Sequence, residues 1–369
     1  MQRDMNKYVL MAVYCTIQTD ARVIRSAEAI NDMGEDVVVI SYNSDLNYTN
    51  KKFNSIFFTG RKNKLSLIIF WYNVFIYTIK NRKNIKLLYF HDYYLCGIGK
   101  ILSRIIGVKW VYDAHELLIE RKNTKRTIRQ KLFSYLEKNK IRKADLVISA
   151  NSEREKIVRN IYQLKNSIYV LNIAAFNIQD EIAANVKKEN IIVYQGYIAK
   201  ERGIEEYINL LLFLPNNIRL KIIGGGPDIE FFKDLVVKRN LSKRVEFTGK
   251  IPYSQLIHEN KHCKIGIVSY SLIGLNNFYC SPNKLYDYAR LAMPMIFSSQ
   301  PFLKKISKEY GIGEVFYKDM SYELKAKAVM NIFNNMALYQ RNMNCFLSDY
   351  SHEREMNKLK QSIRNLLST

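Results

Sequence analysis

The chain has 369 residues, which is too long for one ordinary domain and suits two domains of about 150–200 residues each. Hydrophobic residues (48%) and charged residues (25%) are in normal globular proportion, so two sizeable cores are possible. The net charge of +23 favours a polyanionic partner, such as nucleic acid, an anionic membrane surface or a phosphorylated substrate. The five scattered cysteines include no CxxC pair, which argues against a disulfide framework or a zinc site and favours a cytosolic protein.

Apolar, β-branched runs separated by helical segments occupy the first half of the chain. The expected strands are 8–14, 36–41, 86–91, 108–112, 145–149 and 167–171, with helices at 22–33 and 97–106. Because the first strand begins so near Met1, we expect no signal peptide, and no apolar run is long enough to cross a bilayer. Alternating strands and helices predict βαβ units and a parallel sheet.

A second series of the same kind follows. Its expected strands are 190–195, 218–223, 244–248, 264–269 and 294–298. The fold class is therefore α/β, with two Rossmann-like, doubly wound parallel-sheet domains facing a cleft. We expect an N-terminal acceptor-binding domain over 1–177 and a second, ligand-binding domain over 178–350. A last helix over 351–369 is expected to pack back on the first domain.

Ionisable residues follow three expected strands of the first half, where a parallel sheet presents its ligands. Asp20 and Arg22 begin the first helix, and Asp20 is also its natural N-cap. His91 and Asp92 follow the third strand, and Asp113, His115 and Glu116 follow the fourth. His115 can hydrogen-bond a sugar hydroxyl or relay a proton, although a lone histidine is more often structural.

The segment 281–296 carries the strongest local pattern of the second half. Ser281 suits an N-cap and Pro282 the first helical position, and the helix is expected to run to about Ala292. Unpaired N–H groups and the positive end of the dipole make such a helix start a diphosphate site, to which Lys284 adds a charge.

Two further positions on the same helix point to a nucleotide. Asp287 lies one turn beyond Asn283 on the same face, where its carboxylate can accept both hydroxyl hydrogens of a ribose. The alternative is an ordinary capped helix with an exposed acid.

Two glycine-containing turns follow strands of the second half. Gly224, Gly225, Gly226 and Pro227 follow one strand, and glycine lets backbone approach a ligand closely. In the other turn, which begins at Gly196, Lys200 and Arg202 can bind phosphate oxygens. A tight turn and ordinary surface cations explain these residues equally well.

Together these motifs resemble the retaining glycosyltransferase family 4, which has the two-Rossmann GT-B architecture. Residues 20–41 look like the opening "D-x-R-V" segment of the family, and 112–117 like its "Y-D-x-H-E-L". Residues 196–203 are similar to "G-x-x-x-x-K/R-G", 224–227 to "G-x-G-P", and 281–296 to "P-N-K-L-F-E-Y". Five motifs in order over nearly the whole chain make the resemblance specific.

The resemblance implies a transfer of sugar from a nucleoside diphosphate to an acceptor hydroxyl with retention of configuration. Arg202 matches the cation that binds the donor diphosphate, Asn283 the diphosphate cradle, and Asp287 the second acid of the E-x7-E pair, which holds the ribose. His115 matches the histidine near the donor sugar, and we assign catalysis to His115, Arg202 and Lys284. The acceptor or sugar side is assigned to Asp20, Arg22, His91, Asp92, Asp113, Glu116 and Tyr279.

The sequence also departs from the family pattern. Tyr279 stands where the first acid of E-x7-E would fall, and Tyr197 replaces the usual arginine. The glycine-rich loop after the first strand is missing from 14–19. No carboxylate is clearly placed as a nucleophile, so a front-face displacement is expected. Because there is no D-x-D motif, we expect neither a metal nor another cofactor.

Two segments suggest contact with an anionic membrane. Residues 121–143 contain ten Lys or Arg and one acid, Glu137, beside apolar residues, which is typical of a helix lying on a membrane surface. Residues 65–79 are apolar and aromatic with basic flanks, and form either an interfacial helix or a core helix. We expect a cytoplasmic protein, peripheral on the inner face of the membrane, with a lipid-linked or saccharide acceptor in polysaccharide or glycolipid synthesis.

Three alternatives remain at this point. A nucleic-acid-binding protein is disfavoured because zinc-finger, helix-turn-helix and RNP-like patterns are missing. A GT-B scaffold that no longer transfers sugar, or that binds membranes or polyanions, fits the two tyrosine replacements. A phosphorylase on a similar fold would be a much longer chain, and an epimerase would need more acidic residues in its cleft than this sequence supplies.

Overall fold

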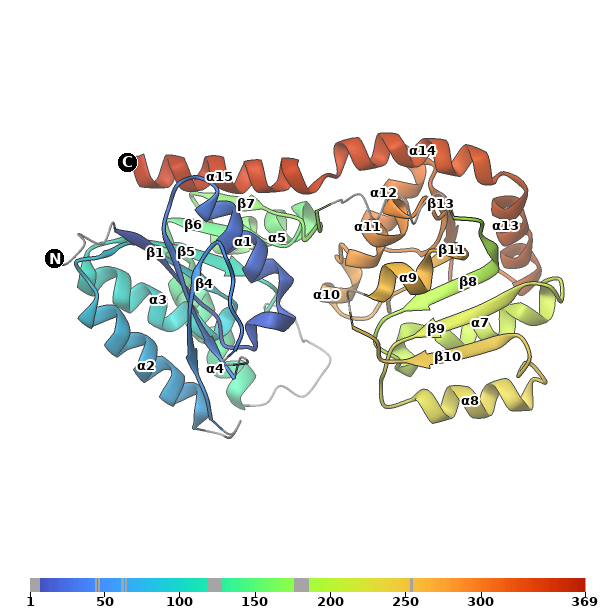
Figure 1. Cartoon of the computed structure of the whole chain (residues 1–369), viewed down its shortest axis with the longest axis horizontal. Coiled ribbons are helices and arrows are strands. Elements are labelled where there is room, and N and C mark those ends of the chain that lie inside the picture. Colours follow the sequence, from blue (N-terminus) through green and yellow to red (C-terminus); the bar gives the residue numbers. More distant parts are fainter. Residues whose placement is uncertain are drawn as a thin grey trace. The chain divides into compact units, whose positions relative to one another are not determined.

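The computed structural model describes residues 7–43, 45, 47–60, 63, 65–118, 128–175, 186–252 and 255–368 (Figure 1). The chain forms two compact units. Unit 1 comprises Met1–Asn172 with Glu353–Thr369, and unit 2 comprises Ile173–His352. The expected boundary at 177 and 178 lies outside the described residues.

Unit 1 is built on a parallel sheet of seven strands in the order β3-β2-β1-β4-β5-β6-β7. Its strands are β1 (Tyr8–Ala12), β2 (Val37–Tyr42), β3 (Asn54–Phe58), β4 (Ile85–His91), β5 (Lys109–Ala114), β6 (Leu146–Ser149) and β7 (Ser167–Tyr169). Its helices are α1 (Ala21–Asn31), α2 (Ser66–Lys80), α3 (Tyr93–Ile106), α4 (Ile128–Lys140), α5 (Ser152–Tyr162) and α15 (His352–Ser368). The expected strands are present, and β3, which we did not predict, adds an edge.

The last helix belongs to unit 1, as expected from the sequence. Met356, Leu359, Ile363 and Leu366 of α15 are buried in one cluster with residues of α1 and the sheet. The Glu355 carboxylate accepts a hydrogen bond from the backbone N–H of Leu171 at 2.7 Å. The apolar spacing along α15 thus supplies part of the core of the N-terminal unit.

Unit 2 repeats the arrangement with six parallel strands in the order β10-β9-β8-β11-β12-β13. Its strands are β8 (Glu189–Gln195), β9 (Arg219–Ile223), β10 (Val245–Gly249), β11 (Cys263–Val268), β12 (Met295–Ser298) and β13 (Gly313–Phe316). Its helices are α7 (Ile204–Leu210), α8 (Ile229–Lys238), α9 (Leu256–Asn260), α10 (Leu275–Phe278), α11 (Asn283–Arg290), α12 (Pro301–Tyr310), α13 (Tyr322–Asn334) and α14 (Met336–Asp349).

Both sheets have the strand order of a Rossmann fold, which confirms the predicted fold class. In each sheet the order reverses beside the first strand, between β1 and β4 in unit 1 and between β8 and β11 in unit 2. Open parallel sheets bind ligands beyond the carboxyl ends of the strands at this switch point. The candidate residues of both halves lie near these two places.

The start of α11 differs from the prediction. Pro282, with φ −73° and ψ 137°, is the N-cap rather than the first helical residue, and the helix begins at Asn283. The Ser281 hydroxyl does not cap the helix, because it hydrogen-bonds the Tyr286 hydroxyl at 2.7 Å. The helix ends at Arg290, since Ala292 has a φ of 49°, outside the helical region.

Candidate functional site

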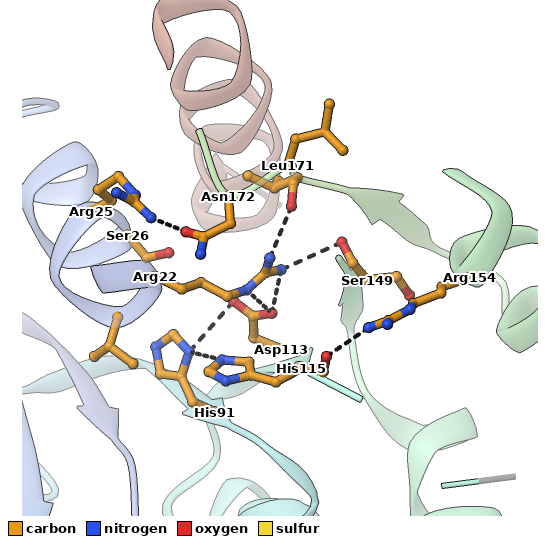
Figure 2. Close-up of polar contacts among 12 residues, drawn as sticks. Arg22, Arg25, Ser26, His91, Asp113, His115, Ser149, Arg154, Leu171 and Asn172 are labelled. Carbon is orange, nitrogen blue, oxygen red and sulfur yellow. Dashed lines mark hydrogen bonds and ion pairs between the residues drawn. The ribbon is translucent and has the colours of Figure 1, made fainter. Parts of the chain in front are cut away.

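A buried ion pair lies beneath the carboxyl edge of the sheet of unit 1 (Figure 2). The Nε and Nη2 atoms of Arg22 both donate to Oδ1 of Asp113, at 2.9 and 2.7 Å. Oδ2 of Asp113 accepts a hydrogen bond from the Tyr89 hydroxyl at 2.9 Å, and Nη1 of Arg22 donates to the Val170 carbonyl at 2.9 Å. Burial by itself raises the pKa of Asp113, but the Arg22 charge and His91 outweigh it and hold this pKa well below its usual range. Both members of the pair therefore stay ionised, and most of their hydrogen-bonding groups already have partners.

Two histidines continue this network toward the surface (Figure 2). Nδ1 of His91 lies 3.4 Å from Oδ2 of Asp113 and 3.2 Å from Nε2 of His115. Nδ1 of His115 lies 3.7 Å from Oδ2 of Asp20. His91 is fully buried, whereas the His115 side chain is 18% exposed. Burial lowers the pKa of His115, and Asp113 only partly offsets this, so His115 is neutral near pH 7.

The other acids predicted for this edge have different surroundings. Asp20 caps α1, since its Oδ1 accepts from the backbone N–H groups of Arg22 and Val23. Asp92 caps α3 by accepting from the Tyr93 N–H at 2.7 Å, although its φ of 64° is unfavourable for a residue with a side chain. Burial raises the pKa of Asp92 to about 6, and His115 limits that rise. Glu116 is exposed.

His91, Asp113 and His115 also form a possible metal-ligand group, since one ligand atom from each lies within 4.8 Å of the others. Two imidazoles and a carboxylate suit zinc or a similar divalent ion. However, Asp113 already carries the Arg22 guanidinium and the Tyr89 hydroxyl. The Arg22 guanidinium is positively charged and would repel a metal ion bound beside it.

In unit 2, the predicted glycine turns pack directly against each other. A Cβ on Gly224 would lie 1.8 Å from the Gly196 carbonyl oxygen, and one on Gly226 would lie 1.9 Å from that of Ile198. Gly196 and Gly224 also have φ values of 141° and 144°. These glycines are therefore required by the close approach of the two turns, whatever ligand they bind.

Two cations lie over one aromatic ring near the switch point of unit 2. The Arg202 guanidinium carbon is 4.8 Å and Nζ of Lys284 is 4.9 Å from the centroid of the Tyr270 ring. Nζ of Lys284 is also 4.3 Å from the centroid of Tyr194. Burial, together with the like charge of Arg202, lowers the pKa of Lys284 to about 7.

Within the part of the chain that the structure describes, no ion pair neutralises these two cations. Among the described residues, neither Arg202 nor Lys284 forms an ion pair, and Nε of Arg202 is buried without a hydrogen-bond partner. Holding two like charges close together and partly shielded from water costs free energy unless an anion binds between them. The arrangement is therefore suited to a bound anion of at least two charges.

The remaining predicted donor residues are placed less directly. Asp287 is already engaged, because its carboxylate accepts from Arg290 at 2.6 Å and from the side chain of Gln195 at 3.1 Å. Nζ of Lys200 lies 4.0 Å from the centroid of the Phe231 ring. The other predicted donor-side positions are Asn283 and Pro227, both exposed, Gly225 in its glycine turn, and Ser281 and Pro282 just before α11. Tyr279, predicted for the acceptor or sugar side, lies at the end of α10.

Sequence reasoning missed the aromatic part of this site. Tyr194 and Tyr270 lie under the cations, and Tyr270 comes two residues after β11, where ligand-binding side chains of a parallel sheet are expected. Arg290 lies three residues after Asp287, a spacing that brings side chains together on a helix. Both signals were present in the sequence.

Comparison with known proteins agrees with this architecture. Residues 176–344 match the sequence model of the family described as glycosyl transferases group 1. The C-terminal half of the chain therefore carries a glycosyl transferases group 1 domain. No curated protein sequence matches this chain.

Solved structures show the same GT-B fold at low sequence identity. Sucrose-phosphate synthase from Thermosynechococcus elongatus is 17% identical with a TM-score of 0.76, and the match covers 98% of this chain and 100% of that chain. Anabaena HepE in complex with UDP is 13% identical with a TM-score of 0.72, over 98% and 99% of the two chains. WaaG, a glycosyltransferase involved in lipopolysaccharide biosynthesis, is 13% identical with a TM-score of 0.70, over 96% and 99%.

Proposed function

We propose that this glycosyltransferase moves a sugar from a nucleoside-diphosphate sugar to an acceptor hydroxyl with retention of configuration and without a metal ion. The observation that carries the proposal is the pair of cations, Arg202 and Lys284, which lie over Tyr270 with no acidic partner among the described residues. A diphosphate supplies the missing negative charge. That HepE was crystallised with UDP and with UDP-glucose supports a nucleotide-sugar donor here.

The same groups account for the chemistry. As the bond between sugar and diphosphate breaks, negative charge develops on the leaving oxygens, where Arg202, Lys284 and the first N–H groups of α11 stabilise it. A leaving oxygen takes the proton of the acceptor hydroxyl while that hydroxyl attacks the same face of the sugar. Cations held by the protein perform the role that a metal ion performs in other enzymes. Unit 1 supplies His115 near the donor sugar and the acceptor-side groups, including Asp20.

Thermal-shift binding tests the donor site first. We expect one of UDP, GDP or ADP, or one of their sugar conjugates, to raise the melting temperature in the presence of EDTA. Arg202→Ala should lose most of this shift, because a charge-assisted contact to the diphosphate is removed. Lys305→Ala is the matched control, since Lys305 is an exposed cation of the same unit that pairs with Glu309.

Two outcomes would contradict the donor proposal. A shift that requires a divalent metal ion would exclude metal-independent binding. No shift with any nucleotide would favour the alternative, a GT-B protein that has lost transfer and acts as a scaffold or binds polyanions. Retention would then be tested on the product, by the anomeric configuration of the new linkage.

We also propose that unit 1 associates peripherally with an anionic membrane on the cytoplasmic side, where a lipid-linked or saccharide acceptor is extended in cell-surface polysaccharide or glycolipid synthesis. No helix among the described residues is long and apolar enough to span a bilayer. Apolar side chains are nevertheless exposed on three helices: Ile68, Ile69 and Tyr72 of α2, Ile101 and Ile105 of α3, and Leu132 and Tyr135 of α4.

The three helices pack against one another in unit 1. Trp71 of α2 donates to the Tyr94 carbonyl of α3, and its ring meets Phe133 of α4 edge-on at 6.2 Å. Exposed cations, among them Arg104 and Lys131, accompany the apolar side chains. Apolar and basic side chains on one surface bind anionic lipid headgroups and the underlying acyl region. Of the basic stretch predicted over 121–143, residues 121–127 lie outside the described part of the chain.

Vesicle co-sedimentation tests this surface. The protein should bind phosphatidylcholine vesicles that contain phosphatidylglycerol, and should bind pure phosphatidylcholine weakly. Ile68→Asp with Ile69→Asp should reduce binding by roughly tenfold, because the apolar contact is lost. Val237→Asp, a change at an equally exposed apolar residue of unit 2, is the control. Equal binding by both variants would contradict the assignment of the surface to unit 1.

A further inference from the structure

The fully buried imidazole of His91 has a single well-defined polar contact point. Its Nδ1 atom lies between Oδ2 of Asp113 at 3.4 Å and Nε2 of His115 at 3.2 Å (Figure 2). Its Nε2 atom is buried and has no hydrogen-bond partner among the described residues. The Tyr89 ring stacks on it, with centroids 4.7 Å apart. The position of one proton therefore decides what His91 does.

The Arg22–Asp113 pair decides where that proton is. Because Arg22 keeps Asp113 ionised, Nδ1 of His91 faces a carboxylate oxygen and must carry a proton to be attracted to it. The opposite tautomer would turn a lone pair toward the carboxylate and leave a buried N–H without an acceptor, which is unfavourable. His91 is thus the Nδ1–H tautomer.

The tautomer of His91 in turn fixes the tautomer of His115. An Nδ1–H on His91 is shared between Asp113 and Nε2 of His115, so Nε2 of His115 must be the acceptor. The proton of neutral His115 then lies on Nδ1, the nitrogen that faces Asp20. A solvated imidazole prefers its proton on Nε2, so the network selects the less favoured tautomer.

We propose that His91 is a positioning residue, which holds His115 as the Nδ1–H tautomer and so presents an N–H beside Asp20 as a donor to a substrate hydroxyl. The part of this inference that concerns the hydroxyl rests on the proposed transferase function. His115 then acts as a hydrogen-bond donor and Asp20 as the acceptor beside it. Neither residue needs to change its ionisation during the reaction.

A metal ion is the competing explanation for the same geometry. Ligand atoms bound to one tetrahedral zinc ion at about 2.0–2.1 Å lie roughly 3.3 Å apart, which resembles the two distances from His91. A metal ion would, however, need an unprotonated Nδ1 on His91 and a second cation beside the Arg22–Asp113 pair. The two explanations differ in the protonation of both rings.

Nitrogen-15 NMR of protein labelled in its histidine rings tests the tautomers directly. Assignment uses single His→Gln variants. In EDTA near neutral pH, His91 and His115 should both show a protonated Nδ1 and an unprotonated Nε2. A protonated Nε2 on His115 in the wild-type protein would overturn the proposal. The proposal would also be overturned if the ring signals of His91 and His115 changed when EDTA is replaced by an equimolar amount of zinc, because such a change would indicate a metal site.

Two substitutions separate positioning from packing. His91→Asn retains an N–H where Nδ1 lies, whereas His91→Leu retains the bulk and removes the donor. We expect the Leu variant to shift the His115 proton toward Nε2 and to release nucleoside diphosphate from the donor sugar at least about tenfold more slowly, with the Asn variant near wild type. Both should keep the wild-type thermal shift with the nucleotide.

The outcomes distinguish this inference from the proposed function. If the Leu and Asn variants are equally slow while nucleotide binding persists, His91 has only a packing role and the positioning proposal is wrong. If the wild-type protein responds to no nucleotide, the transferase proposal fails, while the NMR result still decides the tautomers. If the Leu variant does not fold, the wild-type spectrum and the Asn variant carry the test.

Discussion

The charges at the candidate site of unit 1 and those at the candidate site of unit 2 are arranged in opposite ways. In unit 1, Arg22 and Asp113 neutralise each other within 2.7 Å and are further bonded to the surrounding backbone and to Tyr89. In unit 2, Arg202 and Lys284 lie over an aromatic ring without a carboxylate partner among the described residues. Both places lie near the switch point of a Rossmann-like sheet.

The difference separates charges that hold the fold from charges that await a ligand. A saturated buried pair contributes to a fixed geometry, and a ligand gains little by competing for it. Cations supported only by aromatic rings have lost water without gaining an anion, so an anionic ligand relieves this cost. Arg22 and Asp113, which the sequence suggested for substrate contact, are thus better explained as supports for the histidines.

The largest expected effect is the loss of one partner of the pair in unit 1. Asp113→Asn or Arg22→Met should lower the free energy of unfolding by about 3–5 kcal/mol, because one buried charge remains without its partner. Urea denaturation followed by circular dichroism measures this change. Nucleotide binding by unit 2 should be retained wherever the protein stays folded.

The exposed ion pair between Lys52 and Asp32 provides the control for that prediction. Its side chains are 46% and 40% exposed at an N–O distance of 2.8 Å, so Asp32→Asn should cost less than about 1 kcal/mol. Equal losses for the buried and the exposed pair would show that Asp113 does not organise unit 1.

Much of the fold could be predicted because it depends on local pattern. Buried β-branched runs indicated eleven of the thirteen strands, and Asp20 indicated the start of α1. The two missed strands, β3 and β13, are short edge strands without such a run. Local pattern carries little information about edges, because an edge strand buries less of its surface.

The candidate site was predicted less completely, for a different physical reason. Position after a strand suggested Arg22 and Asp113 individually, but their pairing joins residues 91 positions apart. The same limit applies to Asp287, whose partners Arg290 and Gln195 make it part of a hydrogen-bond network that the motif did not indicate. Contacts of this kind depend on how the strands are ordered, which the motifs alone do not specify.

A smaller effect is expected at Glu137, a buried acid of unit 1 that accepts from the Tyr112 and Tyr162 hydroxyls at 2.7 and 3.2 Å. Burial raises its pKa from 4.5 to about 7, and the two hydroxyls limit the rise. The folded state therefore holds a proton that the unfolded state releases between these values. Its stabilising contribution is present below pH 4.5 and is lost as the pH rises through 7.

Glu137→Gln should remove this dependence, because the amide does not ionise. At about pH 8 the variant should be more stable than the wild type by roughly 1–3 kcal/mol, and the difference should shrink toward about pH 5. Melting temperature against pH measures both curves. A constant difference across that range would show that Glu137 does not titrate near neutrality.

The next prediction concerns Lys284 of unit 2, where we expect changes of about tenfold in nucleotide affinity. Since burial lowers its pKa to about 7, part of the population is neutral at about pH 8, and a bound diphosphate should raise this pKa. Nucleotide binding should therefore take up protons, and affinity should fall as the pH rises from 7 toward the usual lysine value of 10.5.

Calorimetric titration in buffers of different ionisation enthalpy measures that proton uptake. Lys284→Met should bind the nucleotide about tenfold more weakly and should take up no protons at this site. Arg202→Lys, which keeps a cation in the same turn, should retain the uptake. An unchanged proton count in the Met variant would place the titrating group elsewhere.

The smallest expected effect concerns Asp92, whose backbone has φ 64° and ψ 160°, a conformation that suits glycine. Asp92→Gly removes an N-cap at a cost of a few tenths of a kcal/mol but relieves backbone strain, so we expect a net stabilisation of about 0.5–1 kcal/mol. Gln163→Gly, at a φ of 50° after α5, is the control for glycine at a positive φ. If both variants are more stable but only Asp92→Gly turns over the donor more slowly, the strain at Asp92 is maintained for function. If Asp92→Gly keeps full turnover, Asp92 belongs with the residues that hold the fold, beside Arg22 and Asp113.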